Sequence, residues 1–591
     1  MRLRRLVGWA AAVGTVAGTL TVPLLAGLST PAAAVSFNPG PSHRFHAPVS
    51  AMGIGAINRS VNPHGGDAPH AASGALAGNN GGSGSGGLSS IPLPRNIIRF
   101  NTDQSYISQS ETTVSVDPGN TRHVVGGVND GRMFFCPVLP ASDCPSGFTQ
   151  SLSGFTTSAN GGRSVTFSDD IPGLTVNGDF LASWGDPMVA AAPGGNFYYS
   201  SLAISPTDTS NGIQLSISNQ KLWRNPASCT TPLATPAVNP CWSTTFVFGF
   251  TGTSVATFED KPMMAVDRDK NSPFYGDAYV GWDHFAADGT SSSYLARCNQ
   301  RLRCTMLSGG TQPVLSGSDP FVGFTTPVVG LTGNVYVTWC NFGTATTLTP
   351  IACRAASSGP GGTSFGAPSN ILSTNGGLVG YATEQFRTTN VPVLAVDTSR
   401  RTTSGNLYFT IDVCTAGNYI DVTASEPGNC GSSAVLFSRS TNGGKTWSAP
   451  ASVSAMAPRR GSAINPADAV TAQPWVTVDP RTGEVDLLYY SSQFDRFDHR
   501  LDVVAAGSRN AGRSWNFGRI TRTSIEPNSD PTYYDYTIAN GFGGSFVVPQ
   551  FGDYFQAVAL NGRLWTSFNA TYVVKLGTFQ TDPFLAVTFE P

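Results

Sequence analysis

One phrase recurs seven times along the chain, and this repeat limits the possible folds more than any other feature of the sequence. Each copy combines an acidic or amide residue, a short apolar run typical of a β-strand, a turn, and a second run rich in aromatic residues. Measured between the residues aligned on Asp117, the copies follow one another at intervals of 58 to 82 residues. They begin at Glu111, Asp186, Asp260, Asp319, Asn390, Gln473 and Asp553. Aligned on Asp117, the equivalent residues are Ala192, Asp267, Thr325, Asp397, Asp479 and Ala559.

Each repeat is long enough for four short strands and their loops. Four-stranded units arranged around one axis form a β-propeller, in which radial packing protects the sheet edges. Charged residues make up only 12% of the chain, beside 66 Gly and 41 Pro, and helical periodicity is scarce, which argues against coiled coils and helical solenoids. We predict an all-β propeller of seven four-stranded antiparallel blades, with six blades as the alternative. Residues 94–103, or the terminal sequence FLAVTFEP, could complete a blade that begins at the other end of the chain.

A second motif, S-x-[DN]-x-G-x-x-W, has the features of a hairpin turn. The Asn caps its own backbone, the Gly takes a positive φ, and the aromatic residue packs inward. The motif therefore predicts the turn between the last two strands of a blade. Two full copies, one copy that ends in Val and two degenerate copies start at Ser440, Ser508, Ser158, Ser216 and Ser358.

These copies resemble the Asp-box, or BNR repeat, of the sialidase-like propellers, and the resemblance extends over most of the chain from about residue 100 onward. The late segment Gly552-Asp553-Tyr554 resembles secreted bacterial members of this group. The resemblance implies a propeller fold and, as an activity, glycoside hydrolysis of the exo-sialidase type. It also implies that the Asp-box turns lie at the periphery of the blades and support the structure.

Sialidases also bind their substrate carboxylate with three Arg residues, and use a Tyr nucleophile polarised by Glu together with an Asp acid. An Arg-Ile-Pro motif early in the propeller is part of this pattern. The present sequence has no Arg-Ile-Pro, and Arg99, the nearest early Arg, has different neighbours. The resemblance therefore assigns no catalytic residue, and whether the chain is an enzyme stays open.

The N-terminus has the pattern of a secretory signal peptide. Met1–Arg5 supplies the positive charge, Leu6–Leu28 the apolar stretch, and Pro31–Ala34 a small-residue cleavage site, so we predict a signal peptide at residues 1–34. A membrane anchor is the alternative. Residues 35–95 are rich in Gly, Ser and Asn and are expected to form a flexible linker before the propeller at 96–591. The mature chain, without a second spanning segment, is expected to be secreted and extracellular or cell-surface associated.

The ten Cys residues are arranged as close neighbours in the sequence, which favours local disulfides in an exported protein. No C-x2-C doublet or Cys/His cluster suggests zinc. Each bridge would close one short loop and contribute roughly 2–3 kcal/mol in the chain-entropy model. The predicted pairs are Cys136–Cys144, Cys229–Cys241, Cys298–Cys304, Cys340–Cys353 and Cys414–Cys430.

The acidic residues that begin the repeats are candidates for a ligand site. The first strand of a propeller blade is innermost, so its start lies at the rim of the central channel. Clustered carboxylates must be solvated, share protons or hold a cation. We predict a funnel for a polar ligand or for calcium, although each acid could simply cap a turn. The predicted ligand-binding residues are Glu111, Asp186, Asp260, Asp319 and Asp553, with Tyr554 as an aromatic surface beside them.

Three other segments are weaker candidates. Asp267–Asn271 is similar to the start of a calcium loop but lacks the Gly and Glu that such a loop needs, so a solvated turn is expected. Pro527–Tyr536 and Ser491–Arg500 are charged and aromatic loops that could contact a sugar or be ordinary surface.

The sequence thus favours a secreted propeller that acts on or binds extracellular glycans or another polar small ligand, with a non-catalytic binding or adhesion propeller as the alternative. No cofactor is required by either reading. The net charge of −2 gives no reason to expect nucleic acid, and a monomer is expected.

Overall fold

The computed structural model describes residues 93–102, 109–130, 151–205, 210–231, 238–251, 257–288, 290–308, 315–316, 322–341, 351–374, 381–382, 386–387, 390–417, 430–529, 538–539, 545–546, 552–575 and 578–591. All of these belong to the unit 35–591. The predicted signal peptide and all but the last residues of the predicted linker lie outside the described residues. No helix of the described part is long and apolar enough to cross a membrane.

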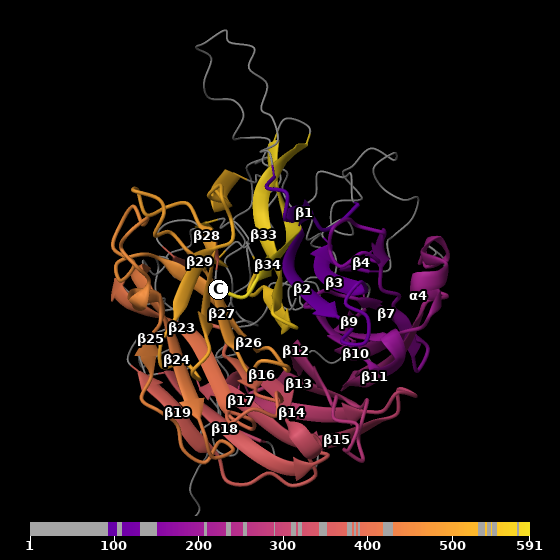
Figure 1. Ribbon diagram of the computed structural model, residues 1–591. Coiled ribbons are helices and arrows are strands. Elements are labelled where there is room, and N and C mark those ends of the chain that lie inside the picture. Colours follow the sequence, from indigo (N-terminus) through magenta and orange to yellow (C-terminus); the bar gives the residue numbers. More distant parts are fainter. Residues whose placement is uncertain are drawn as a thin grey trace, which may run out of the picture. The chain divides into compact units, whose positions relative to one another are not determined.

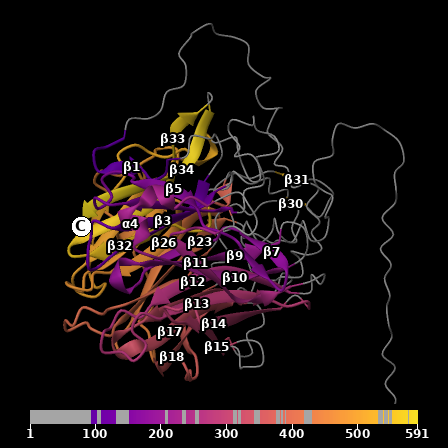
Figure 2. The same cartoon turned by 90° about the vertical axis from the view of Figure 1, so that its right-hand side faces the viewer.

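The described residues form the predicted seven-bladed β-propeller, and each blade is an antiparallel sheet with its first strand innermost (Figure 1). Blade 1 consists of β2 Gln109–Val116, β3 Val124–Asp130, β4 Ser153–Ser158 and β5 Phe167–Asp170. Blade 2 consists of β8 Met188–Ala191, β9 Phe197–Ile204, β10 Asn211–Ser218 and β11 Trp242–Phe250, with β7 Asp179–Ser183 beside β9 and β6 Leu174–Val176 beyond it (Figure 2).

The next two blades follow the same pattern. Blade 3 consists of β12 Phe258–Val266, β13 Ala278–Phe285, β14 Ser291–Cys298 and β15 Cys304–Ser308. Blade 4 consists of β16 Val322–Val329, β17 Asn334–Asn341, β18 Ile351–Pro360 and β19 Ser369–Thr374.

Blades 5 and 6 continue the ring. Blade 5 consists of β22 Val393–Val396, β23 Leu407–Gly417, β24 Cys430–Ser440 and β25 Ala451–Ser452, with β20 Tyr381–Ala382 and β21 Phe386–Arg387 added beside β24. Blade 6 consists of β26 Thr471–Val478, β27 Val485–Ser491, β28 Asp502–Ser508 and β29 Asn516–Arg519.

The seventh blade joins the two ends of the propeller. It consists of β32 Gln556–Leu560, β33 Arg563–Lys575, β34 Thr578–Phe589 and, as its outermost strand, β1 Ile97–Arg99. The terminal sequence FLAVTFEP contributes to β34, and β1 comes from the early segment, so both predicted closing segments meet in one blade. The innermost strands contact one another in order around the ring, and β32 of the last blade contacts β2 of the first.

Outside the blades the chain is mostly turns. A short hairpin is formed by β30 Ile538–Ala539 and β31 Ser545–Phe546. The one α-helix of the described residues is α4 Lys221–Arg224. Short 3-10 turns are η2 Pro193–Gly195, η3 Pro226–Ser228, η4 Leu331–Gly333, η5 Ser454–Met456 and η6 Pro527–Ser529.

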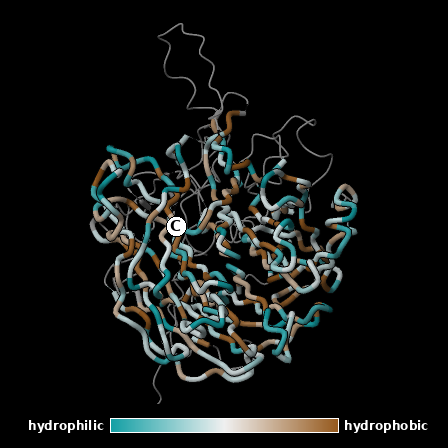
Figure 3. Tube along the Cα trace, in the orientation of Figure 1, coloured by the Kyte–Doolittle hydropathy of each residue, from teal (hydrophilic) through white to brown (hydrophobic). Residues whose placement is uncertain are grey.

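Hydrophobic and hydrophilic residues are mixed throughout the blades (Figure 3), and the largest buried cluster draws on strands of many blades, so the core is distributed around the ring. Trp184, Trp282 and Trp339 are completely buried in it. Burial of one such large side chain contributes roughly 2–3 kcal/mol, so packing between the sheets stabilises the ring.

The copies of the serine motif form the predicted turns between the third and fourth strands. In the copy at Ser440, the Ser440 hydroxyl donates to Asn442 Oδ1 over 2.9 Å and accepts from the Gly444 amide over 2.9 Å. Asn442 Oδ1 also accepts from the Thr446 amide over 3.0 Å. The copies at Ser158 and Ser508 repeat these contacts.

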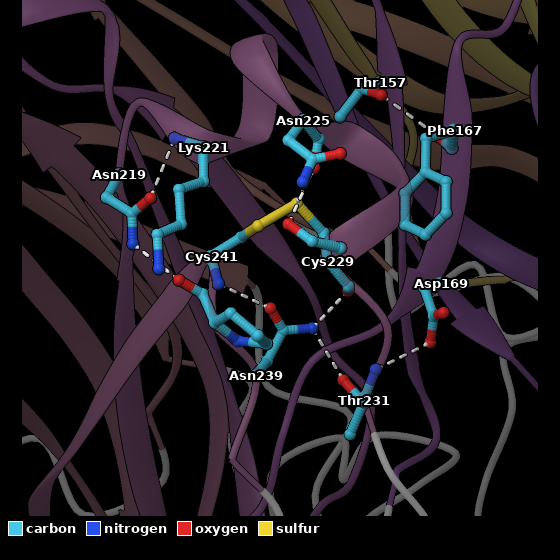
Figure 4. Close-up of a disulfide and its surroundings, with 12 residues drawn as sticks. Thr157, Phe167, Asp169, Asn219, Lys221, Asn225, Cys229, Thr231, Asn239 and Cys241 are labelled. Atoms are coloured by element: carbon cyan, nitrogen blue, oxygen red, sulfur yellow. Dashed lines mark hydrogen bonds between the residues drawn. A yellow bond between two sulfur atoms is a disulfide. The ribbon is translucent and has the colours of Figure 1, made fainter.

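Three predicted disulfides are present, namely Cys229–Cys241, Cys298–Cys304 and Cys340–Cys353. The first closes the connection between β10 and β11, where Asn239 accepts a hydrogen bond from the Cys241 amide over 2.8 Å (Figure 4). Cys414 is disulfide-bonded, but the side chain of Cys430 lies outside the described residues. Cys136 and Cys144 lie outside them too.

The alignment of the fourth repeat on Thr325 is wrong. Asp117 follows its strand, and its amide donates to His123 O across the turn. In blade 4 the equivalent hydrogen bond is donated by the amide of Gly330 to Asn334 O over 2.8 Å. Thr325 lies inside β16. Gly330 has no side chain to mark the turn, so the pattern of residue types was misleading there. Ala559 also lies inside its strand, β32.

Candidate functional site

The residues that begin the repeats lie where the innermost strands start, at one end of the central channel. We call this end the entry face of the propeller. Glu111, Asp186, Asp260 and Asp553 are all completely buried, and Tyr554 is 4% exposed. Asp319 lies outside the described residues. The predicted carboxylates are thus not a solvated rim, since they are enclosed by protein.

The backbone bends sharply at this level. Each of four innermost strands has a register shift against its neighbour here, in β2, β12, β16 and β26. A left-handed conformation costs a residue with a side chain roughly 1–2 kcal/mol and persists only where its surroundings fix it. The residues with φ of 51° to 62° at this level are Glu111, Asp186, Lys261, Phe324 and Gln473.

A buried ion pair spans the channel axis at this level. Lys261 Nζ lies 2.8 Å from Asp553 Oδ2, and the two side chains are 2% and 0% exposed. Lys261 starts blade 3 and Asp553 starts blade 7, so the pair joins opposite sides of the ring. The ammonium group also lies 4.7 Å from the centre of the Phe324 ring. Lys261 thus supplies a positive charge at the place for which the sequence suggested a bound cation.

Glu111 and Asp186 are connected through one amide side chain. Asn129 donates from Nδ2 to Glu111 Oε2 over 2.8 Å, and its Oδ1 accepts from the Asp186 amide over 2.8 Å. The Asp553 amide donates to Glu111 Oε1 over 3.3 Å. The structure therefore brings Glu111, Asp186 and Asp553 into one hydrogen-bonded network, although they lie in three different blades.

Tyr554 does not present the aromatic surface that the sequence suggested. Its hydroxyl donates to Pro187 O over 2.9 Å, which joins blade 7 to blade 2. Burial, reinforced by the nearby Glu111 and Asp186 carboxylates, raises the pKa of Tyr554 well above its ordinary value. Tyr554 is therefore a neutral donor inside the network. We call Glu111, Asp186, Lys261, Asp553 and Tyr554 the axial cluster.

Asp260 and the amide residues of the ring lie next to the axial cluster. Asp260 Oδ1 accepts from the Lys261 amide over 3.0 Å, so this acid does cap its local turn. Asn390 donates to Asp412 O over 2.7 Å, and Gln473 donates to Gly552 O. The amide residues thus make contacts to backbone carbonyls.

Acids on the second strands connect neighbouring blades, which the sequence did not suggest. Asp283 of blade 3 accepts from the Phe324 amide over 2.6 Å and from the Thr325 amide and hydroxyl, all in blade 4. Asp412 of blade 5 lies in the same way beside the Gln473 amide of blade 6. In the sequence, these acids could have been found only from the Asn or Asp that recurs near the end of the second strand of a blade. This residue is Asn129, Asp283 or Asp412.

Burial raises the pKa of Asp283 and that of Asp412 to about 7, although hydrogen bonds to the carboxylates act in the opposite direction. An acid with a raised pKa stabilises the fold fully below its unfolded pKa, near 4, and loses this contribution as the pH rises to 7. In the wild type the free energy of unfolding should fall between pH 4 and pH 7, and in Asp412→Asn it should fall less. Denaturant titration at each pH measures this difference. A shift of one unit corresponds to about 1.4 kcal/mol.

The exposed Asp288 provides the control, because its pKa is lowered by hydrogen bonds from Thr290. Asp288→Asn should leave the dependence on pH between 5 and 7 as in the wild type. If Asp412→Asn does the same, Asp412 ionises at its ordinary pH in the folded protein.

A second, accessible group of side chains lies on the same face, in the loop between β27 and β28. His499 Nε2 lies 2.8 Å from Glu526 Oε1, and both side chains are about one-third exposed. Arg500 pairs with the buried Asp495 over 3.2 Å. Phe497 is 68% exposed. The loop is at the entry face because Ser491, which precedes it, pairs with Thr471 at the start of β26.

The segment Asp267–Asn271, which is similar to the start of a calcium loop, forms the turn that the sequence favoured. Asp267 accepts from the Asp269 amide over 3.0 Å, and Asp269 accepts from the Thr332 amide over 2.7 Å, so both carboxylates bind backbone. Within the described residues no group of three or more His, Cys, Asp or Glu side chains is arranged to hold a metal ion. Of Pro527–Tyr536, only residues 527–529 are described.

The sequence matches no protein-family model and no curated protein sequence. Among solved structures, it is similar to a Hadza microbial sialidase, at 12% identity over 74% of this chain and 73% of that chain, with a TM-score of 0.37. It is also similar to the GH93 α-L-arabinofuranosidase of Fusarium graminearum, at 10% identity over 72% and 98% of the two chains, with a TM-score of 0.38. The Trypanosoma rangeli sialidase matches at 11% identity over 70% and 57%, with a TM-score of 0.35. These likenesses assign no activity to this chain.

Proposed function

We propose that the chain is an extracellular propeller that engages glycans at its entry face, where the loop between β27 and β28 is exposed and the axial cluster lies buried. The observation that carries this proposal is the convergence of Glu111, Asp186 and Asp553 with Lys261 on the channel axis. Buried charges reduce stability unless they are paired and fully hydrogen-bonded, and they gather at functional sites. The resemblance of the serine-motif turns to the Asp-box of sialidase-like propellers supports a glycan as the ligand.

As an enzyme, the protein would be a glycoside hydrolase of the sialidase-like kind. Glycoside hydrolysis needs one carboxylic acid that protonates the leaving oxygen and one carboxylate that activates water or attacks the anomeric carbon. Asp553, which pairs with the Lys261 ammonium group over 2.8 Å, is the candidate for the second role. Glu111, which accepts from Asn129 and from the Asp553 amide, is then the candidate for the first role.

A non-catalytic glycan-binding propeller is the second candidate, and the complete burial of the axial carboxylates favours it. The accessible residues of the entry face then provide the ligand surface. Phe497 offers an exposed ring on which a sugar can stack, and Arg496, 4.4 Å from the centre of that ring, and Arg500 offer donors to sugar hydroxyls or carboxylates.

One experiment separates the two candidates. The full-length protein is incubated with a fluorogenic sialoside and a panel of aryl glycosides, and its binding is measured on a glycan array. Turnover that falls about 100-fold or more in Asp553→Asn, with the melting temperature of the variant measured in parallel, identifies the enzyme. Array binding without turnover identifies the binding propeller, and in this case Phe497→Ala should weaken binding about threefold to tenfold.

The matched control is Phe589→Ala. Phe589 is 75% exposed but lies at the opposite end of its blade, where it pairs with Arg563 at the start of β33. This variant should bind glycans as the wild type does. Absence of both turnover and array binding would contradict the proposed function.

An extracellular location is a further part of the proposal. The disulfides agree with an oxidising compartment.

A further inference from the structure

The central channel opens at the end opposite the entry face, and it is a separate cavity of about 970 Å³. Innermost strands or adjoining turns from all seven blades line it, so it coincides with the axis of the propeller. The axial cluster lies beyond its inner end, at the level where the same strands begin. A volume of this size accommodates a small organic molecule.

The wall of the cavity offers apolar side chains, such as Met263, Leu394 and Trp475. Three polar side chains of the wall already bind backbone. Thr326 donates to Pro392 O over 3.0 Å, Thr477 accepts from the Ala559 amide over 3.2 Å, and Gln556 accepts from the Val114 amide over 3.0 Å. Each innermost strand pairs with a neighbouring strand on one side only. Its other edge faces the axis and presents backbone amides and carbonyls to the cavity. The body of a ligand here would thus meet apolar side chains and some backbone amides.

The mouth of the cavity carries uncommitted positive charge. Arg268, Lys270 and Arg400 line it and are exposed, and within the described part of the chain none of them makes a hydrogen bond or an ion pair. The acids of the mouth are committed to turns: Asp117 accepts from the Gly119 amide over 2.8 Å, and Asp269 from the Thr332 amide over 2.7 Å. The charge of Asp117 acts on Arg268 and that of Asp269 on Arg400, but three cations stand against these two acids, so the mouth keeps a net positive charge for an anion.

Arg268 lies two residues after the end of β12, an innermost strand that lines the cavity. It is exposed to water, yet desolvation by surrounding protein lowers the pKa of its guanidinium group, against the opposing effect of Asp117. Both properties fit a side chain that lines the cavity. A guanidinium group in such a place can bind a carboxylate or phosphate with two hydrogen bonds.

We propose that this channel is a second binding site, for a small organic anion whose carboxylate or phosphate group binds Arg268 and Arg400 and whose body lies against the apolar wall. The site does not depend on the proposed glycan function, because it opens at the other end of the molecule and shares no residue with the axial cluster.

The test is a titration of the full-length protein with phenyl phosphate, benzoate and the neutral benzyl alcohol, followed by ligand-observed NMR. We expect both anions to bind at least about tenfold more tightly than the alcohol, and the difference to shrink at high salt. Which anion binds more tightly distinguishes a phosphate ligand from a carboxylate ligand.

The double variant Arg268→Gln/Arg400→Gln should weaken anion binding at least about tenfold. Arg163→Gln/Arg513→Gln removes the same charge from exposed positions of the serine-motif turns, on the same side of the propeller but outside the cavity. This control should bind as the wild type does. Equal binding of the anions and the alcohol, or equal loss in both double variants, would overturn the proposal. Both pairs are exposed, and a melting curve shows that each variant is folded.

Discussion

Lys261→Met is expected to lower the free energy of unfolding by about 3–5 kcal/mol, because it leaves the Asp553 carboxylate buried without its counter-ion. The two side chains are 2% and 0% exposed, so water cannot replace the ammonium group. The ion pair also joins opposite blades, so its loss acts on the whole ring and not on one blade. Denaturant titration of the variant and the wild type measures the effect.

Two variants complete this test. Lys445→Met changes an exposed lysine in a serine-motif turn and should alter stability by less than about 0.5 kcal/mol. Lys261→Met combined with Asp553→Leu removes both charges and should recover part of the loss, since a buried pair can often be replaced by apolar residues. A loss in Lys261→Met as small as that in Lys445→Met would show that the axial ion pair has no role in stability.

Phe100→Ala should lower the free energy of unfolding by about 3–5 kcal/mol, the usual loss when a buried Phe is truncated. Phe100 follows β1, is 2% exposed and packs with Val114, Trp565 and Leu585, and its amide donates to Pro583 O over 2.8 Å. The ring lies so close to Gly126 that any side chain there would collide with it. The variant should therefore loosen the join between blade 7 and blade 1, seen as a lower melting temperature and faster proteolysis before residue 109.

Ile98→Ala is the matched control for Phe100→Ala. Ile98 lies in β1, two residues before Phe100, but is only partly buried, and its truncation should cost about 1 kcal/mol. If both variants lose the same stability, the first strand contributes through backbone pairing and not through the Phe100 ring.

The architecture could be predicted from the sequence because each blade is specified by short sequence patterns that recur along the chain. Seven similar phrases predicted seven blades, the serine motif predicted the turns at Ser158, Ser440 and Ser508, and close Cys neighbours predicted three of the bridges now seen. Each of these signals involves residues that are near in the chain. Local chemistry therefore sufficed for the blades.

The candidate site could be predicted only in part. The acids at the start of the repeats were found, and Glu111, Asp186 and Asp553 do meet. Their burial and the presence of Lys261 were not foreseen, because Lys261 and Asp553 are 292 residues apart and nothing in either phrase identifies the other as a partner. The bulges that set the direction of these side chains also leave no pattern of residue types, since Glu, Asp, Lys, Phe and Gln all occupy the left-handed position.

The strand β1 also has a consequence for biosynthesis. Its partner β34 follows much later in the chain, and the Arg99–Asp582 contact joins positions 483 residues apart. Contacts of such high sequence separation form late and slowly. During synthesis β1 therefore has no partner until blade 7 has been made, and only then can the ring close.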